Sequence, residues 1–348
     1  MSSRAIHSPR QPRRAGFWAV YLVSLLVAVA VFLAIAGETY EAISRSRDQR
    51  EFRHWGELVD VGGFRLNLNC LGAGSPTVVL DSGLGLPAAE WSLVEPDVAE
   101  FTRVCSYDRA GYGWSNVGPF PRTSAQISHE LHNLLKNARV RPPYVLVGHS
   151  FGGYNVRVYT REYPDEVAGI VLVEAAHEDE FELLPGQFRA ADQKRLRWLH
   201  RLQPFVPMLI HLGVERLFLR AEPSYGIASD VLEEMRYLEL SSKSFDSMLG
   251  ELDAMPQSIS EVRSSGSVGK RPLLVLSGAK AGEDLPESLD REAFRKIWMG
   301  ELPSSLALLS IHGGQVLVPD AGRLIPLKQP QAVTAAVKEI VDQIRARY

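Results

Sequence analysis

The feature that most constrains the fold is the regular alternation of short apolar runs with helical patterns along most of the chain. The apolar runs have strand length, are rich in β-branched residues and are bounded by turn residues, which is typical of buried parallel strands. They are PTVVLDSG, TRVCSYD, PYVLVGHS, AGIVLVEAA, RPLLVLSG and QVLVPDAG. Helical patterns lie between them, such as SAQISHELHNLLKNA and the final PQAVTAAVKEIVDQIRAR. This alternation predicts an α/β fold with a mostly parallel sheet.

Two segments depart from the alternation. Ahead of it, GELVDVGG and FRLNLNCLG have the texture of a β-hairpin. Between about residues 178 and 268 the chain holds helical patterns such as AADQKRLRWLHRL but no obvious sheet strand. We therefore predict a helical cap, inserted after a strand of the sheet, within a folded domain that spans residues 51–348.

The first 50 residues have the pattern of a membrane anchor. Residues 17–36 contain no charged side chain, and roughly 20 apolar residues suffice to span the hydrocarbon core of a bilayer. Four arginines precede this run: Arg4, Arg10, Arg13 and Arg14. Because basic residues tend to stay on the cytoplasmic side, we predict a cytoplasmic tail, a single-pass signal anchor, a linker and an extracytoplasmic folded domain.

The alternative is a secreted protein. Ala34-Ile35-Ala36 resembles the small-residue site at which a signal peptide is cleaved, so the chain would be released after cleavage near Ala36. The apolar run is longer than the about 7 to 15 residues of a usual signal core, which favours the uncleaved anchor.

Charge and cysteine content limit the function classes. With 38 basic and 41 acidic residues and a net charge of −3, no strong field favours a nucleic acid as partner. Two cysteines are too few for a disulfide-rich scaffold or a cysteine-built zinc site. His129 and His132 share a predicted helix without a third metal ligand at suitable spacing. The sequence implies no metal and no organic cofactor.

One motif carries chemistry. An apolar run, residues 144–147, leads directly into Gly148-His149-Ser150-Phe151-Gly152, and a helical pattern follows. This is the G-x-S-x-G nucleophile elbow, in which flanking glycines allow a tight turn that exposes the serine hydroxyl at the top of the sheet. The N-terminal amides of the following helix point at negative charge that develops there. Ser150 is therefore the candidate nucleophile.

With this motif the chain resembles the α/β-hydrolase family, from about residue 59 to the C-terminus apart from most of the cap. LDSGLG is similar to the family's loop after the third strand, and the resemblance implies an oxyanion hole made by the amides of Leu84 and Phe151. YDRAGYGWS is similar to a conserved turn of the family, in which Asp108 and Arg109 would brace the loop. The family fold implies a mostly parallel eight-stranded sheet with helices on both faces and an inserted helical cap.

The resemblance also implies a place for the two cysteines. The family's strand order sets the strand that carries Cys70 beside the strand that carries Cys105. Neighbouring strands bring Cα atoms close enough for a bridge. A disulfide between them is expected if the domain is exported.

A serine nucleophile needs a general base, oriented by a carboxylate. In this family the chain order is serine, acid, histidine. The acid usually follows the strand that corresponds to RPLLVLSG, where Glu283 and Asp284 are the candidates, and we favour Asp284. Glu174, at the end of the preceding strand, is the second choice because some members of the family take the acid from there.

The base is where this chain departs from the family. The last turn of the family resembles G-H-x-I-P-x-x-x-P, and AGRLIPLKQP matches it except that Arg323 occupies the histidine position. A guanidinium has a pKa above about 12 and cannot accept a proton near neutral pH. His177 is the best substitute, because it follows the strand that ends near the elbow. His312 precedes the last strand and lies at its other end, and His149 is expected to pack away from the nucleophile.

Two functions follow from these residues. The first is a membrane-anchored serine hydrolase that acts on a carboxylic ester or related small acyl substrate; apolar stretches of the cap such as FVPMLIHLGVERLFL suggest a mostly apolar acyl or alcohol group. The second is a catalytically impaired relative that binds a ligand or a partner, because loss of the triad histidine costs on the order of 10⁶ in kcat in a serine protease.

Overall fold

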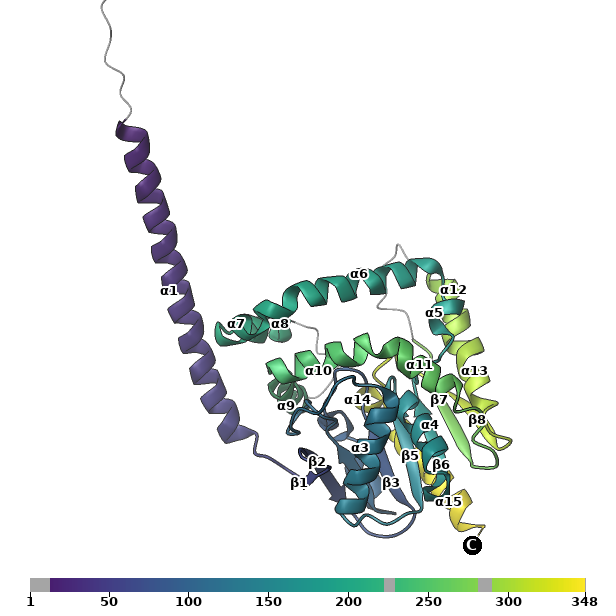
Figure 1. Cartoon of the computed structure of the whole chain (residues 1–348). Coiled ribbons are helices and arrows are strands. Elements are labelled where there is room, and N and C mark those ends of the chain that lie inside the picture. Colours follow the sequence, from purple (N-terminus) through teal and green to yellow (C-terminus); the bar gives the residue numbers. More distant parts are fainter. Residues whose placement is uncertain (1–12, 222–228, 281–289, 348) are drawn as a thin grey trace, which may run out of the picture.

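The computed structural model describes residues 13–221, 229–280 and 290–347, and its centre is one eight-stranded sheet (Figure 1). The strand order is β1-β2-β4-β3-β5-β6-β7-β8. The strands are β1 (Glu57–Asp60), β2 (Arg65–Leu71), β3 (Thr77–Asp81), β4 (Val104–Tyr107), β5 (Tyr144–His149), β6 (Val167–Val173), β7 (Leu273–Gly278) and β8 (Gly313–Val318). The pairs β1–β2 and β2–β4 are antiparallel and the other neighbours are parallel, which confirms the predicted mostly parallel sheet.

Helices cover both faces of the sheet, and this is why the central strands are apolar along their whole length. All residues of β3, β5 and β7 are buried. On one face, α3 (Ser124–Asn137) and α4 (Gly152–Glu162) contribute to a first core cluster. On the other face, α2 (Glu95–Ala99) and α15 (Pro330–Arg345) contribute to a second. Two separate apolar layers therefore hold the sheet rigid beneath the site.

The strand β8 differs from the sequence prediction. It forms at the predicted place, but its residues are mostly exposed, among them Val316 at 42% and Leu317 at 48%. The reason is position, because β8 is the last strand of the sheet and pairs only with β7. An apolar strand pattern predicts strand formation here but not burial on both faces.

Within the described residues, seven α-helices lie between β6 and β7, in the interval predicted as a cap (Figure 1). They are α5 (Glu180–Leu183), α6 (Gly186–Leu202), α7 (Val206–His211), α8 (Val214–Ala221), α9 (Ser229–Glu239), α10 (Ser242–Asp253) and α11 (Met255–Arg263). The helix α11 packs on α3 and α4 beside the sheet, whereas α6 crosses the top of the domain. Between β7 and the end of the chain lie α12 (Arg291–Lys296), a π-helical turn (Ile297–Glu301), α13 (Leu302–Ala307), β8, α14 (Ile325–Lys328) and α15.

The N-terminal helix α1 (Arg13–Glu51) is longer than the predicted anchor. It continues through the segment predicted as a linker, because that segment packs on the cap instead of remaining free. The guanidinium of Arg216 on α8 lies 2.8 Å from Oε2 of Glu41 and 2.5 Å from Oδ2 of Asp48. Within the described residues, one helix is long and apolar enough to cross a membrane, and its apolar window is not buried in the protein.

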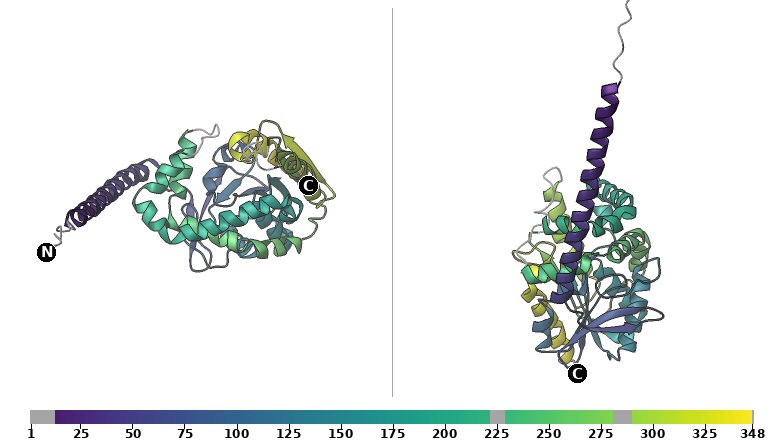
Figure 2. Two further views of the ribbon diagram at one scale, coloured as in Figure 1. Left: turned by 90° about the horizontal axis from the view of Figure 1, so that it is seen from above. Right: turned by 90° about the vertical axis from the view of Figure 1, so that its left-hand side faces the viewer.

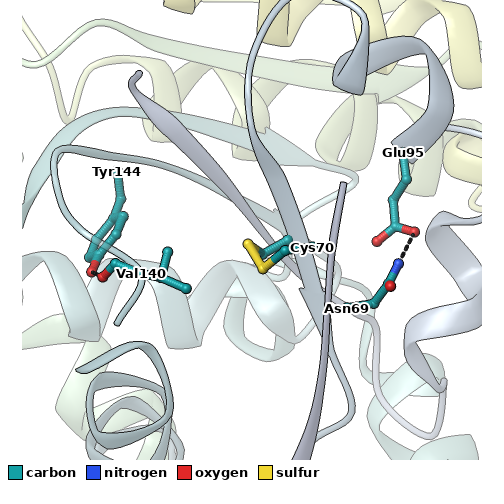
Figure 3. The surroundings of a disulfide bond; sticks show 6 residues. Asn69, Cys70, Glu95, Val140 and Tyr144 are labelled. Carbon is teal, nitrogen blue, oxygen red and sulfur yellow. Dashed lines mark hydrogen bonds between the residues drawn. A yellow bond between two sulfur atoms is a disulfide. The ribbon is translucent and has the colours of Figure 1, made fainter. Parts of the chain in front are cut away.

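A disulfide joins Cys70 on β2 to Cys105 on β4 (Figure 3). The two residues lie opposite each other in the antiparallel register, with their Cα atoms 4.1 Å apart. The pairing implied by the family's strand order is therefore confirmed. It closes a loop across 35 positions of the chain and fixes the β2 edge of the sheet to its parallel core.

Candidate active site

The loop between β5 and α4 has the geometry of a nucleophile elbow. Ser150 has φ 49°, in the left-handed region that a non-glycine residue rarely adopts. A Cβ at Gly148 would lie 2.5 Å from the carbonyl oxygen of Gly152, and a Cβ at Gly152 would overlap the carbonyl oxygen of Asp81. Both glycines are therefore required by close backbone approach. The amide of Ser150 donates to the carbonyl of Val173 at 3.1 Å, which ties the turn to β6.

The amides predicted to form the oxyanion hole, those of Leu84 and Phe151, lie in segments next to Ser150. Leu84 lines the same cavity as Ser150, and Phe151 follows Ser150 at the start of α4. Neither amide donates to an acceptor within the described parts of the chain. The neighbouring amide of Gly83 donates instead to Oε2 of Glu90 at 3.0 Å, which fixes the loop that carries Leu84. These two amides can therefore stabilise negative charge on a substrate oxygen.

Arg109 braces the loop that carries Leu84. Its guanidinium donates to the carbonyl oxygens of Ser82 at 2.6 Å and Gly83 at 2.8 Å. It also forms two hydrogen bonds, at 2.8 and 3.0 Å, with Glu251 on the cap helix α10 and one with Asp81 at 2.9 Å. Burial would lower the pKa of Arg109, but the two carboxylates raise it above its ordinary value. One buried cation thus joins the sheet, the loop and the cap.

Asp108 braces the adjacent turn, as the sequence predicts. Its carboxylate accepts from the amides of Ala88 at 2.8 Å and Trp114 at 3.0 Å and from the side-chain amide of Asn67 at 3.1 Å. Burial raises the pKa of Asp108, and these donors oppose that effect. It has no place in the cavity wall and acts on the loop alone.

A cavity of about 540 Å³ opens above the carboxyl ends of the parallel strands. The lining residues used below are Leu84, Leu86, His149, Ser150, Glu174 and Arg323. Asp320, also in the wall, lies 2.8 Å from Nζ of Lys280, and a hydrogen bond from that lysine lowers the pKa of Asp320. Its carboxylate is therefore a poor proton acceptor.

Glu174, the second candidate for the acid, lies in this cavity wall. It has φ 44° and is 5% exposed, and its carboxylate accepts hydrogen bonds from the amide of Gly278 and from Nε1 of Trp298, the latter at 2.7 Å. Burial raises the pKa of Glu174, while these donors and the positive charges of His149 and Arg323 lower it. The structure thus brings Glu174 together with Ser150 and Arg323.

Arg323 stacks on an aromatic ring at the edge of the cavity. Its guanidinium carbon lies 5.4 Å from the ring centroid of Trp298, the same indole that donates to Glu174. Such cation–π contacts favour a fixed guanidinium. At the position where the family has its base, this chain therefore has a permanent cation.

Contrary to the expectation from the sequence, His149 does not pack away from Ser150, because both residues line the same cavity. Its Nδ1 is 2.5 Å from Oε1 of Glu90, and its Nε2 donates to the carbonyl oxygen of Arg323 at 2.9 Å. Nε2 faces a hydrogen-bond acceptor and Nδ1 faces a carboxylate oxygen, and this arrangement favours the imidazolium form. Burial would lower the pKa of His149, but the charge of Glu90 and these hydrogen bonds raise it above the ordinary value. His149 links the oxyanion side of the cavity to the Arg323 loop.

This raised pKa gives a testable pH dependence. The stabilisation from charged His149 is fully present below the unfolded-state pKa of about 6.5 and is lost as the pH rises through the higher folded-state pKa. We expect the melting temperature of the full chain in detergent to fall above about pH 6.5. The His149→Gln variant should show a flatter curve over the same range, and parallel curves for parent and variant would contradict the charged state.

His177, the predicted substitute base, is held away from this chemistry. Its Nδ1 accepts the amide hydrogen of Asp179 at 3.0 Å, so Nε2 carries the proton and donates to Oγ of Ser305 at 2.7 Å. Ser305 in turn donates to the carbonyl oxygen of Leu302. The ring is buried and is not part of the cavity wall, although the amide of the preceding Ala176 donates to the carbonyl oxygen of Ser150. Its contacts are those of a residue that docks the start of the cap onto α13.

The remaining candidates lie elsewhere. Glu283 and Asp284 lie outside the described residues. His312 directly precedes β8, at the end of the sheet opposite to the elbow. Among the described residues there is no cluster of three or more histidine, cysteine or acidic side chains that could hold a metal ion.

Three partners in the site were not found from sequence: Glu90, Glu251 and Trp298. Each lies in a helix or helical turn, and its residue type is ordinary for such an element, so it does not stand out in the sequence. Glu90 and Glu251 are completely buried, and a buried acidic side chain usually indicates a cationic or hydrogen-bonding partner. A single sequence does not show this burial, so it gave no signal for either residue.

Comparison with known proteins agrees with this geometry. The model of the alpha/beta hydrolase family matches residues 78–337. This chain belongs to that family. Among solved structures, the chain resembles a thermophilic esterase from Thermogutta terrifontis, with a TM-score of 0.60 and 21% identity, over 84% of this chain and 99% of that one. It also resembles the enol-lactonase from Burkholderia xenovorans LB400, with a TM-score of 0.58 and 18% identity, over 82% and 100% of the two chains. At these identities the likeness concerns the fold.

Sequence relatives of the chain include the uncharacterized protein YbdG of Bacillus subtilis, 26% identical over 54% of this chain and 57% of the relative. An AB hydrolase superfamily protein of Gibberella zeae is 31% identical over 30% of this chain and 33% of the relative. The first three curated relatives are matched over 57%, 43% and 60% of their own length.

Proposed function

We propose that this chain is a serine hydrolase that cleaves a carboxylic ester or a related acyl substrate. One observation carries the proposal: Ser150 is held at positive φ in the cavity wall, near two amides that have no acceptor within the described residues. Strain of this kind persists only where surrounding structure imposes it, and it concentrates at functional sites. The apolar side chains of Leu84 and Leu86 offer a wall for an acyl or alcohol group.

In the proposed reaction, Oγ of Ser150 forms a bond to the acyl carbon and the alcohol leaves. The amides of Leu84 and Phe151 donate to the carbonyl oxygen as it gains negative charge. Water then attacks the acyl-enzyme and releases the acid. These groups alone retain about 10³- to 10⁴-fold rate acceleration over water when the base of such a site is removed.

The proton of Ser150 has no imidazole acceptor in this proposal. The ring nitrogens of His149 and His177 are all engaged in hydrogen bonds or ion contacts. The proton therefore passes to water in the cavity, and turnover is slow and rises with pH. We assign Glu174 as the acid of the ancestral triad because it shares the cavity with Ser150 and Arg323, with Asp284 and Glu283 as the alternatives.

The second candidate function is binding of a ligand or a partner without turnover. Its supporting observation is the Arg323 guanidinium stacked on Trp298, beside the buried carboxylate of Glu174. In this arrangement the Arg323 guanidinium completes the cavity wall and sets a positive charge where the family has its histidine base. An anionic ligand group would be bound where an ester carbonyl would otherwise react.

A Ser150→Ala variant tests the proposal. The parent chain in detergent should react with a fluorophosphonate probe and release p-nitrophenol from a short-chain ester, and Ser150→Ala should abolish both signals because it removes the only proposed nucleophile. Gel fluorescence and absorbance are the measurements. A parent that is neither labelled nor active, but becomes both in Arg323→His, would overturn the serine hydrolase proposal and favour the binding function.

We further propose that α1 is a single-pass anchor that keeps the hydrolase domain on the extracytoplasmic side of a membrane. Residues 17–36 are apolar and exposed over almost the whole segment, and the disulfide suits an oxidising compartment. The alternative, release after cleavage near Ala36, predicts a shorter mature chain. Mass spectrometry of the membrane-extracted protein distinguishes the two.

A further inference from the structure

We propose that the outer face of the cap lies flat on the bilayer that holds α1 and binds anionic lipid headgroups there. The cap face is defined by Lys194, Arg197, Trp198, Arg201, Phe205 and Met208. The inference rests on the proposed anchoring by α1 but not on the proposed reaction at Ser150. It would place the cap of the hydrolase at the lipid surface.

The helix α6 supplies the charged part of this face. Only Leu199 is buried among its 17 residues. Lys194, Arg197, Trp198 and Arg201 are spaced three and four residues apart, so they share the side of the helix opposite to Leu199. All four side chains are exposed, and the three cations have no salt bridge within the described residues.

The inner side of α6 is attached to the domain. Nε2 of His200 is 2.9 Å from Oδ1 of Asp253, and the side-chain amide of Gln203 donates to Asp246 at 2.9 Å, both on α10. These contacts turn the cationic side away from the sheet. Figure 2 shows α6 crossing the upper surface of the domain when seen from above.

Apolar side chains continue the face beyond α6. Trp198 is 58% exposed, Phe205 is 53% exposed and Met208 on α7 is 51% exposed. Basic residues mixed with large apolar and aromatic ones are typical of helices that lie in the plane of a membrane interface. Large apolar side chains that are exposed close together along the chain favour an interaction surface.

The contact between α1 and the cap determines how far the cap face lies from the hydrocarbon core of the bilayer. The apolar run of α1 ends at Ala36, and a Cβ on the next residue, Gly37, would overlap the carbonyl oxygen of Leu212 at the end of α7. The buried Arg216 ion pairs with Glu41 and Asp48 fix the rest of this contact. The end of α7 therefore lies where the hydrocarbon core ends.

The figures agree with this placement. In Figure 1, α6 and α7 lie on the side of the domain toward which α1 rises, whereas α15 ends on the other side. Figure 2 shows the N-terminal half of α1 extending past the cap on that side. A bilayer around residues 17–36 would meet the cap face first, and its cations favour a surface that carries anionic headgroups.

The test uses the full chain reconstituted in vesicles. The native cysteines are bonded to each other, so a single introduced cysteine can be labelled with an environment-sensitive maleimide dye. The labelled variants are Trp198→Cys and Met208→Cys, with Glu339→Cys on the exposed side of α15 as the matched control. Vesicles contain phosphatidylcholine with or without phosphatidylglycerol, plus a nitroxide-labelled lipid as quencher.

We expect blue-shifted emission and quenching at positions 198 and 208, stronger with phosphatidylglycerol, and water-like unquenched emission at position 339. The triple variant Lys194→Glu/Arg197→Glu/Arg201→Glu should lose the quenching at 198 while its melting temperature stays that of the parent. Protein that floats with the vesicles but shows water-like emission at positions 198 and 208 would overturn the proposed contact of the cap with lipid and leave the proposed anchoring by α1 in place. Protein that does not float with them would overturn the anchoring as well. A blue shift that depends on protein concentration and not on lipid would assign the face to a second copy and also overturn it.

Discussion

Replacing Arg323 by histidine is expected to raise kcat for a short-chain p-nitrophenyl ester by about 10²- to 10⁴-fold. This is the range that a positioned general base contributes. The substitution sets an imidazole at the position where the family has its base, in the wall that already holds Ser150 and Glu174. Glu174 accepts two hydrogen bonds, and a carboxylate has about four acceptor sites, so it can also orient a new imidazole. Stopped-flow or plate absorbance of p-nitrophenol measures the change.

Two controls make the gain specific. Arg323→Gln removes the guanidinium without adding a base and should leave the rate near that of the parent. In the Arg323→His background, Glu174→Gln should remove most of the gain, whereas loss of the gain only in Asp284→Asn would assign the acid to Asp284. His177→Ala in the parent should not change turnover, because both its ring nitrogens are engaged with Asp179 and Ser305. A rate in Arg323→His no higher than in Arg323→Gln would refute the assignment of this position.

Replacing Glu251 by glutamine is expected to destabilise the protein by about 3 to 5 kcal/mol, the cost of breaking a buried ion pair from one side. Glu251 is completely buried and makes two hydrogen bonds with the guanidinium of Arg109. Among the described residues, Asp81 would then be the remaining carboxylate paired with the buried guanidinium, and one carboxylate compensates its burial less completely than two. Denaturant unfolding of the full chain in detergent measures the loss.

The same change should also lower kcat, because Arg109 holds the carbonyl oxygens of the loop that presents the Leu84 amide. The matched control is Asp342→Asn, which breaks the exposed Lys338–Asp342 pair on α15. Exposed pairs contribute at most about 1 kcal/mol, so this variant should behave like the parent. If both variants have the same free energy of unfolding, the Arg109–Glu251 pair does not stabilise the loop and the cap.

Much of the fold was predictable because local patterns determine local structure. The β-branched runs became strands, and the glycines around Ser150 became a tight turn since no larger side chain fits there. The family likeness supplied the strand order that paired Cys70 with Cys105. The exposed β8 and the full length of α1 were not predictable, because burial of a strand and docking of a helix depend on what lies beside them.

The sequence by itself determined the α/β alternation, the elbow at Ser150 and the presence of arginine where the family has its base. Only the tertiary structure decided which polar groups meet: Arg109 with Glu251, 142 positions away, and Arg216 with Glu41, 175 positions away. The periodicity of apolar residues predicts the helix or strand in which a residue lies. Pairs between distant residues depend instead on how whole helices and strands pack against one another. The charge state of His149 is decided in the same way, because its partners Glu90, in a helical turn, and Arg323, in a loop, are far apart in the chain.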